Sequence, residues 1–412
     1  MLIECIKLQI LELQENILYQ TFRQNLRSAT KVFAVNIGLF LVGFLLIEVI
    51  FGSWFKAPNL WSLSIYRNKD WTFVANEKYP GVNIVRYRRD YYGLRGDYGK
   101  IKQIRILTLG GSTTDERFVS DGKTWTDTLD NCLEKKIGSQ IGTANAGVTG
   151  QTTRGHAKNF DVWLNHIPDL APKYVLVYFG VNERGIVKLA DKDDVRDFNE
   201  SNRPISRIKI LRKWFYMNSA IYAMWRIFRG NLAADKLGFA PYRRKDFDRR
   251  VFEIRNTQDK LGTERVNLRY VENSLSKIAT GTPEFQKLLN AELSISKDKL
   301  NALTERLGIL REKIIDFGAT PVFVTQSWGH YRIKGGMISG DLDLYFTARA
   351  ENESIMEFCA EKDMGCINLG EELEFHDNDF WDIVHTSPQG SSRIGNFICE
   401  RLYSMKHFSI EP

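Results

Sequence analysis

Short apolar runs that stop at glycine, asparagine or threonine recur along the chain after residue 100. They lie at Ile104–Leu109, in "IGTANAG" ending at Gly147, in "KYVLVYFG" ending at Gly180, at Pro321–Thr325 and at Gly365–Leu369. Runs this short, bounded by turn residues, are typical of strands buried on both faces. Helical patterns separate them, including one through Trp125, Leu129 and Leu133, and another follows the last strand at Ser391–Leu402. This alternation predicts an α/β doubly wound fold with a parallel sheet of about five strands.

The rhythm of strands and helices breaks between residues about 186 and 282. Arg207–Gly230 is basic and aromatic at once, and the sequence after it is strongly charged. We interpret residues 186–282 as a helical insertion above the strand ends. Its amphipathic part fits either a helix on a membrane surface or a lid or wall packed on the sheet, and we favour the lid or wall. Leu288–Phe317 then predicts one long helix that leads into the strand at Pro321.

A long apolar run near the N-terminus predicts a transmembrane helix. Residues 32–47 carry no charge, Glu48 interrupts the run, and it continues to Phe55. At about 1.5 Å per residue, residues 32–55 reach about 36 Å, enough to cross a hydrocarbon core of about 30 Å. Trp54 and Phe55 suit the aromatic belt of a bilayer. A buried core helix and a cleaved signal peptide are the alternatives, but the run is long, starts late and lacks an A-x-A site.

The charges that flank this run predict its orientation. Arg23, Arg27 and Lys31 precede it, whereas only Lys56 follows closely. Cytoplasmic flanks are richer in cations, so we expect residues 1–31 inside the cell. We expect a linker and lead-in at 56–100 and a catalytic domain at 101–412 outside. Residues 1–20 carry a short heptad stripe, which fits a lone surface helix or a coiled-coil dimer. The stripe consists of Ile3, Ile6, Ile10, Leu13 and Ile17.

The composition limits the class of protein but does not identify its function. The 412 residues are 43% hydrophobic and 26% charged, as in a globular protein, and the net charge is +7. This modest excess permits an anionic partner such as a lipid surface or an acidic glycan; we expect no nucleic-acid partner. None of the five cysteines forms a CxxC pair, which argues against a zinc ribbon or a redox pair. Free buried thiols are favoured over disulfides for the four cysteines after residue 100.

Polar and glycine residues that suit acyl transfer follow the predicted strands. Ser112 comes directly after the first strand, Gly147 ends the second and Asn182 follows the third; "WDIVHTSPQG" near the C-terminus contains Asp382 and His385. The carboxyl ends of parallel strands meet at one edge of a sheet, where functional crevices lie. We therefore expect these five residues in one crevice.

Acyl transfer gives each of these residues a role. Ser112 supplies a nucleophilic hydroxyl, His385 a general base, and Asp382 a carboxylate that orients the imidazole. The N–H groups of Ser112 and Gly147 and the side-chain amide of Asn182 supply donors for the oxyanion. Singly these signals are weak, because GGS after a strand is more often a turn. Their combination at strand ends is what predicts a catalytic triad.

Three further residues follow strand ends, and motifs of other site types are missing from the sequence. Arg184, Gln326 and His330 lie just after strand ends and are candidates for lining the substrate pocket. The sequence has no GxxxxGK[ST] phosphate loop and no GxGxxG dinucleotide motif. The GxSxG elbow of α/β-hydrolases is also missing around Ser112, which argues against that fold.

These motifs resemble the blocks of the SGNH (GDSL-type) hydrolase family. "LGGSTT" is similar to its first block, "NAGVTG" to its second, "YFGVNE" to its third and "DIVHTSPQG" to its fifth. The resemblance implies the same roles for Ser112, Gly147, Asn182, Asp382 and His385. Two positions depart from it. Residue 111 is glycine where the family often has Asp, and residue 183 is glutamate where Asp usually follows the asparagine of the third block.

The resemblance also implies a fold and a function. It implies a flavodoxin-like three-layer fold, no metal or organic cofactor, and an esterase, thioesterase, lipase, glycan deacetylase or acyltransferase. A membrane-tethered form with an external domain looks like bacterial proteins associated with surface polysaccharide. We expect a serine esterase or acyltransferase that acts on O-acetyl groups of a cell-surface glycan. A lipase or phospholipase and a non-catalytic, membrane-tethered glycan-binding or assembly protein remain alternatives.

Overall fold

A five-stranded parallel sheet forms the centre of the fold. The computed structural model describes residues 29–52, 54, 65–74, 84–185, single residues between 211 and 229, 248–253, 271–406 and 408–410. The strands are β3 (Ile106–Gly110), β4 (Thr143–Asn145), β5 (Tyr174–Tyr178), β8 (Thr320–Val324) and β11 (Cys366–Ile367). They pair in the order β11-β8-β5-β3-β4, and every pair is parallel. Counted along the chain this is the flavodoxin-like order 2-1-3-4-5, so the predicted fold class is confirmed.

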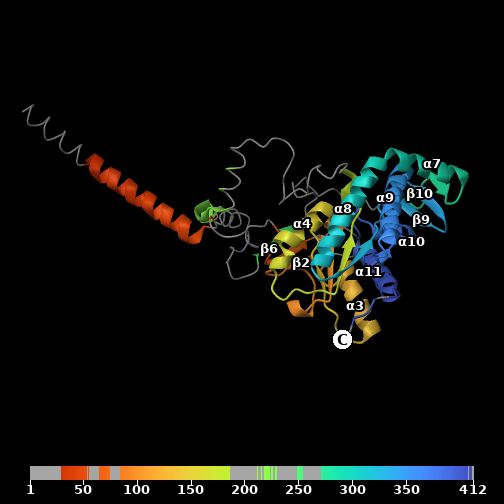
Figure 1. Cartoon of the computed structure of the whole chain (residues 1–412), viewed down its shortest axis with the longest axis horizontal. Coiled ribbons are helices and arrows are strands. Elements are labelled where there is room, and N and C mark those ends of the chain that lie inside the picture. The colour runs from red at the N-terminus through yellow and green to blue at the C-terminus, as the bar shows by residue number, and fades with distance from the viewer. Residues whose placement is uncertain are drawn as a thin grey trace, which may run out of the picture. The chain divides into compact units, whose positions relative to one another are not determined.

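Helices cover both faces of this sheet (Figure 1). One face packs against α3 (Trp125–Ile137) and α11 (Pro388–Tyr403), and the other against α4 (Thr153–Val162), α8 (Lys297–Asp316) and α9 (Leu342–Glu361). Side chains alternate between the two faces along each strand. Leu107 and Leu109 of β3 belong to the core under α4, α8 and α9, whereas Ile106 belongs to the core under α3 and α11. All three side chains are buried completely, which explains the continuous apolar runs.

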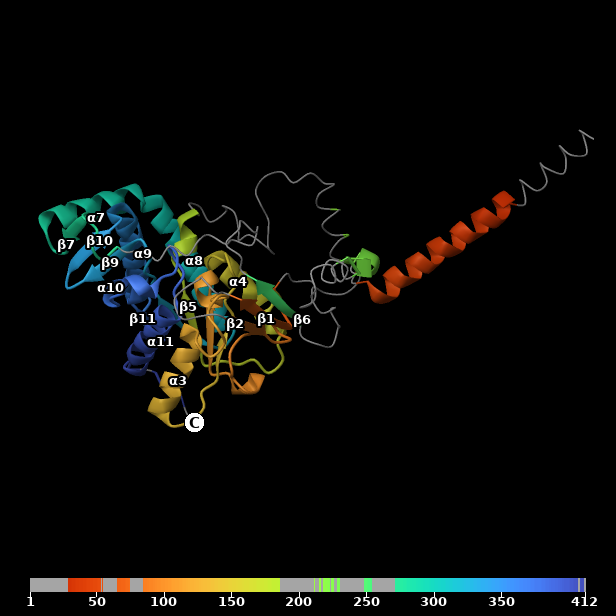
Figure 2. The same ribbon diagram turned by 180° about the vertical axis from the view of Figure 1, so that it is seen from behind.

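Two smaller sheets flank the central one. β1 (Lys69–Val74), β2 (Ile84–Arg89) and β6 (Asp248–Glu253) form the first, in which β1 pairs antiparallel with β2 and parallel with β6 (Figure 2). β7 (Lys277–Ala279), β9 (Tyr331–Lys334) and β10 (Met337–Gly340) form the second, which packs against α7 (Pro283–Ile295). The remaining short elements are α2 (Ser112–Asp115), α10 (Leu369–Glu372), η2 (Ile101–Gln103), η3 (Leu164–His166), η4 (Val181–Gly185) and η5 (Asp377–Asp379).

The structure corrects two predicted elements. The insertion is not purely helical, because β6 and β7 lie within residues 186–282. β6 has a charged sequence without an apolar stripe, and it forms a strand by pairing with β1, a distant partner that local sequence does not reveal. The helix predicted over Leu288–Phe317 is two helices. α7 ends at Ile295 and α8 begins at Lys297, with Ser296 as the cap between them.

The N-terminal apolar segment belongs to a separate compact unit. This unit comprises residues 1–57 and Arg207–Gly230, and the rest of the chain forms the other unit. Its described part contains a helix at Ala29–Phe51, which is long and apolar enough to span a membrane. The helix starts and ends a few residues before the predicted span of 32–55. Its apolar side chains are largely exposed, as for Phe40 at 71%. The heptad stripe predicted for residues 1–20 lies outside the described residues.

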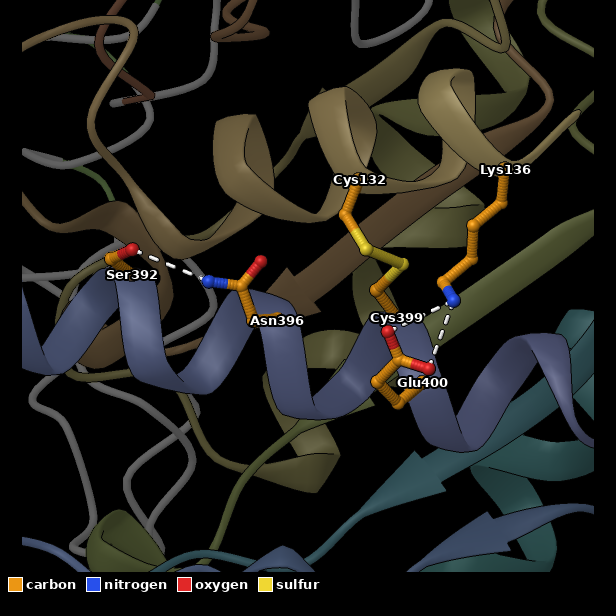
Figure 3. Close-up of a disulfide and its surroundings, with 6 residues drawn as sticks. All are labelled: Cys132, Lys136, Ser392, Asn396, Cys399 and Glu400. Carbon is orange, nitrogen blue, oxygen red and sulfur yellow. Dashed lines mark hydrogen bonds and ion pairs between the residues drawn. A yellow bond between two sulfur atoms is a disulfide. The ribbon is translucent and has the colours of Figure 1, made fainter. Parts of the chain in front are cut away.

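Two disulfides overturn the expectation of free thiols. Cys132 of α3 is bonded to Cys399 of α11, and the Lys136–Glu400 ion pair lies beside them (Figure 3). Cys359 of α9 is bonded to Cys366 of β11. The first pair is 267 residues apart, and only the packing of α3 against α11 brings it together. Stable disulfides are typical of oxidising compartments, so with the N-terminal apolar helix they indicate an extracytoplasmic location.

The Cys132–Cys399 disulfide should stabilise the fold more than the Cys359–Cys366 disulfide. The sequence separations are 267 and 7 residues, and loop-closure entropy gives the longer loop an advantage of about 3 kcal/mol. Thermal denaturation of the purified chain should therefore show a larger drop in Tm for Cys132→Ala/Cys399→Ala than for Cys359→Ala/Cys366→Ala. An equal drop for the two double variants would contradict this account.

Candidate active site

Ser112 stands at the turn from β3 into α2. β3 ends at Gly110, Gly111 caps the short helix, and Ser112 is its first residue. A Cβ on Gly111 would lie 2.3 Å from Asn182 Nδ2, so a side chain at 111 would displace the amide of Asn182.

His385 and Asp382 meet Ser112 in a continuous chain of hydrogen bonds. His385 Nε2 lies 2.8 Å from Ser112 Oγ. His385 Nδ1 lies 2.6 Å from Asp382 Oδ2. The side chain of His385 is 28% exposed and that of Asp382 is 12% exposed, so the imidazole is open to solvent while the carboxylate is largely covered. The structure therefore brings the three predicted triad residues together in hydrogen-bonding order.

The loop that carries His385 is held by its own hydrogen bonds. Asp382 Oδ1 accepts hydrogen bonds from the N–H groups of Val384 at 2.8 Å and His385 at 2.6 Å. The Trp381 ring stacks on the His385 ring with their centroids 5.1 Å apart. Burial alone would raise the pKa of Asp382, but hydrogen bonds from His385 and the backbone hold it below its ordinary value. Asp382 is therefore a carboxylate at neutral pH, as needed to stabilise an imidazolium.

Asn182 lies beside the nucleophile turn, as predicted. It is on η4, directly after β5, and its Nδ2 donates to the Gln151 carbonyl at 2.9 Å. An amide nitrogen carries two hydrogens, so one donor remains for a substrate oxygen. The side chain of Gln151 is in turn fixed by Asn159, whose Nδ2 donates to Gln151 Oε1 at 2.7 Å. Gln151 therefore positions Asn182, a role that sequence reasoning did not assign.

The structure corrects the predicted role of Gly147. Its N–H donates to Asn145 Oδ1 at 2.9 Å, so it is not available to an oxyanion. A Cβ at 147 would lie 2.4 Å from the Asp115 nitrogen, and the absence of a side chain therefore serves the packing of α2. Three residues later, Gly150 has a φ of +82° and precedes Gln151. The backbone N–H groups of Gly150 and Ser112 donate no hydrogen bond to the described residues.

A buried ion pair lies behind the nucleophile turn. Arg89, at the end of β2, donates to Asp115 Oδ1 at 2.6 Å and to the Gly147 carbonyl at 2.5 Å. Tyr87 also donates to Asp115 Oδ1, at 2.7 Å. Burial would raise the pKa of Asp115, but Arg89, Arg117 and Tyr87 hold it well below its ordinary value. Removing one partner of a buried ion pair typically costs about 3–5 kcal/mol, so the small sheet fixes α2 firmly.

Glu116 links the nucleophile turn to the loop of His385. It is buried, its Oε1 accepts a hydrogen bond from Thr386 at 3.1 Å, and its Oε2 accepts one from the Trp125 N–H at 2.7 Å. Ser391 of α11 also donates to Glu116 Oε1. Burial raises the pKa of Glu116 to about 8, although these hydrogen bonds oppose the shift. Because Thr386 directly follows His385, Glu116 joins the two loops whose side chains meet in the triad.

Glu183 is a structural residue behind Asn182. Its side chain is buried and accepts hydrogen bonds from the Thr153 N–H at 2.7 Å and the Thr153 hydroxyl at 3.0 Å. Arg306 of α8 forms an ion pair with it, with Nη2 at 3.2 Å. The longer glutamate thus ties η4 to α4 and α8, and its substitution for the family's Asp leaves Asn182 in place.

The three residues predicted to line a pocket have different environments. Gln326 is buried, and its Oε1 accepts a hydrogen bond from the Val181 N–H at 2.9 Å, so it shapes the backbone before Asn182 instead of facing a pocket. His330 is partly buried and follows Gly329, whose N–H donates to the Ile383 carbonyl at 2.8 Å beside the triad loop. The side chain of Arg184 lies outside the described residues.

Sequence reasoning missed Arg89, Glu116 and Gln151. One signal for Arg89 was the alternation in β2, where Val85, Tyr87 and Arg89 share the buried face. Glu116 stands within "TTDERF", a polar run too common to identify a buried acid. Among the described residues, no group of three or more His, Cys, Asp or Glu side chains is arranged to hold a metal ion.

Comparison with known proteins returned structural likenesses only. No family model and no curated protein matches this chain. The crystal structure of TesA is 10% identical, with a TM-score of 0.36, covering 72% of this chain and 97% of TesA. A lipolytic protein of the G-D-S-L family from Veillonella parvula is 12% identical (TM-score 0.35, covering 73% and 98%). Axe2, an acetylxylan esterase from Geobacillus stearothermophilus, is 10% identical (TM-score 0.35, covering 72% and 92%). Likenesses this distant carry no functional argument, which rests on the site itself.

The buried Glu116 should make stability depend on pH. Its pKa is about 8 in the folded chain against an ordinary 4.5, so the folded state keeps a proton that the unfolded state has lost. The contribution of Glu116 to stability therefore falls as pH rises through this window. Glu116→Gln stays neutral, so its free energy of unfolding relative to the parent should rise by a few kcal/mol from about pH 5 to about pH 8.

Urea denaturation at the two pH values measures this difference. Glu305→Gln, which changes an exposed glutamate on α8, is the matched control and should show no such trend. A constant difference between Glu116→Gln and the parent would show that Glu116 is already ionised in the fold at the lower pH.

Proposed function

We propose that this chain is an SGNH-type serine ester hydrolase or acyltransferase. The observation that carries the proposal is the hydrogen-bonded chain from Asp382 through His385 to Ser112. Such a chain activates a hydroxyl that is otherwise a weak nucleophile at neutral pH. The non-catalytic alternative gives no reason for a serine, an imidazole and a carboxylate to align at a partly exposed site.

The reaction proceeds in two acyl-transfer steps. Ser112 Oγ attacks the carbonyl carbon of the ester while His385 Nε2 takes the hydroxyl proton, and Asp382 stabilises the imidazolium. The tetrahedral intermediate collapses to an acyl-Ser112 ester, and His385 gives the proton to the departing alkoxide. A second hydroxyl then attacks the acyl carbon as His385 removes its proton, and the new tetrahedral intermediate expels Ser112 Oγ, which takes that proton back from His385. Water gives hydrolysis, and a sugar hydroxyl gives transfer.

Three donors are assigned to the oxyanion of each tetrahedral intermediate. The Ser112 N–H and the second Asn182 amide hydrogen keep the roles expected from the sequence. The Gly150 N–H takes the place of Gly147, because the Gly147 N–H already donates to Asn145. The Gly150–Gln151 turn lies beside Ser112, since the Gln151 carbonyl would be 3.5 Å from a Cβ on Gly111.

The substrate assigned to this site is an O-acetylated glycan outside the cytoplasm. The two disulfides and the N-terminal apolar helix support this location, and the helix serves as a single-pass anchor with a cytoplasmic N-terminus. The family that the motifs resemble includes glycan deacetylases and acyltransferases.

Ser112→Ala should abolish covalent labelling by a fluorophosphonate, because only the activated hydroxyl attacks phosphorus. His385→Ala and Asp382→Ala should lower kcat for p-nitrophenyl acetate by several orders of magnitude while the protein stays folded. Ser392→Ala, a change on the surface of α11, is the matched control and should label normally. Undiminished labelling of Ser112→Ala, or normal turnover by His385→Ala, would refute the triad.

Asn182→Ala should lower kcat more than it raises KM. The oxyanion forms only in the transition state, and losing one donor typically costs about 3 kcal/mol, or a factor of 10²–10³ in kcat. Steady-state kinetics on p-nitrophenyl acetate measure both constants. A rise in KM at unchanged kcat would instead make Asn182 a ground-state binding residue.

A further inference from the structure

Glu48, the one charged residue inside the N-terminal apolar run, is bound by a second segment of the chain. Its Oε1 accepts hydrogen bonds from the Ser219 hydroxyl at 2.6 Å and the Ile221 N–H at 3.1 Å. Its Oε2 accepts one from the Ala220 N–H at 2.9 Å. The side chains of Glu48 and Ser219 are buried although the neighbouring apolar side chains are exposed. This carboxylate therefore joins the end of the apolar helix to residues 219–221.

Aromatic contacts extend the same junction. The Trp54 indole N–H donates to Glu48 Oε2 at 2.9 Å, and the Trp54 ring lies 5.7 Å from the Phe215 ring, centroid to centroid. Gly52 makes this fold-back possible, because a Cβ there would lie 2.5 Å from the Trp54 ring. Glu48 thus has partners on both sides, from Trp54 just after the apolar helix and from residues 219–221.

The segment that binds Glu48 has the composition of a helix that lies on a membrane. Arg207–Gly230 contains six Lys and Arg residues, six aromatic residues and no Asp or Glu. The described residues between 220 and 229 are helical. Met224, Trp225 and Phe228 are 53%, 50% and 63% exposed, so one side of this helix presents large apolar groups. Arg229 lies over the Trp225 ring at 5.3 Å.

We infer that the helical residues described between Ala220 and Arg229 lie in the headgroup region of an anionic bilayer, docked on the anchor through Glu48. The bilayer is the occupant of the exposed apolar side because the same unit contains the apolar helix Ala29–Phe51, which is the proposed anchor. Cations and large apolar groups together, without carboxylates, suit anionic headgroups above an apolar interior. The inference rests on the anchor and is independent of the esterase chemistry.

This arrangement changes the interpretation of the insertion. Residues 207–230 belong to the unit of the apolar helix and not to the unit that holds the sheet. The chain leaves η4, which carries Asn182, before this segment and returns at β6 after it. The proposed catalytic domain is therefore joined to the membrane unit by three chain connections, before β1, after η4 and before β6.

Lipid quenching of a fluorophore at residue 228 tests the inference. Four cysteines are in disulfides, so Phe228→Cys in a Cys5→Ser background gives one reactive thiol for an NBD label. The full chain is reconstituted in phosphatidylcholine–phosphatidylglycerol vesicles with or without nitroxide-labelled lipid. We expect the label at 228 to be quenched several-fold more than one at Glu305→Cys, an exposed position on α8. Equal quenching, or a blue-shifted but unquenched label that marks burial in protein, would overturn the interfacial helix.

One further label and two Glu48 variants separate the parts of the inference. A label at Leu39→Cys, inside the apolar helix, should be quenched; if it is not, the anchor itself fails. Glu48→Ala should reduce quenching at 228 without changing it at 39, because the helix loses its docking carboxylate. Glu48→Gln keeps one oxygen acceptor, which can serve the Ser219 hydroxyl and the Ile221 N–H but not the Ala220 N–H as well, and should reduce it less. Unchanged quenching at 228 in Glu48→Ala would overturn the role of Glu48.

Discussion

The hydrogen bond from Ser112 to His385, 2.8 Å between Oγ and Nε2, joins two loops that lie 273 residues apart in the chain. Most of the fold described here serves to hold these loops in contact. The parallel sheet places Ser112 at the end of β3, and α11 follows directly after His385. The Cys132–Cys399 disulfide fastens α11 to α3, and Glu116 accepts hydrogen bonds from both sides of the junction. Several independent contacts thus set the distance between Ser112 Oγ and His385 Nε2.

Buried charge gives this site its rigidity. Arg89 and Asp115 are almost completely buried and contact each other at 2.6 Å, and Arg306 pairs with Glu183 behind Asn182. Burying one of these charges without its partner has a large free-energy cost. Movements of the surrounding loops that would separate a pair are therefore strongly disfavoured. The turn at Ser112 and the side chain of Asn182 are each backed by such a pair. The hydrogen-bond chain of Asp382, His385 and Ser112 is therefore supported by two ion pairs. None of the four residues in these ion pairs has a proposed catalytic role.

Features that depend on the local sequence pattern were predicted, whereas features that depend on contacts between distant segments of the chain were missed. The five central strands were visible because strands buried on both faces are continuously apolar, and Ser112, Asn182, Asp382 and His385 follow from their places after strands or in the last loop. β6 was missed because its partner β1 lies far away in the chain, and the disulfides because helix packing decides which cysteines meet. Gly147 was assigned to the oxyanion hole because spacing does not reveal that Asn145 takes its N–H.

The central claim is that Ser112 carries the acyl group between donor and acceptor. The most direct test is mass spectrometry of the chain after brief reaction with p-nitrophenyl acetate and acid quench, followed by peptide mapping. The account predicts an acetyl group on Ser112, lost on incubation at neutral pH and never formed in Ser112→Ala. An acetyl group on another residue, or none on an enzyme that still releases p-nitrophenol, would contradict it.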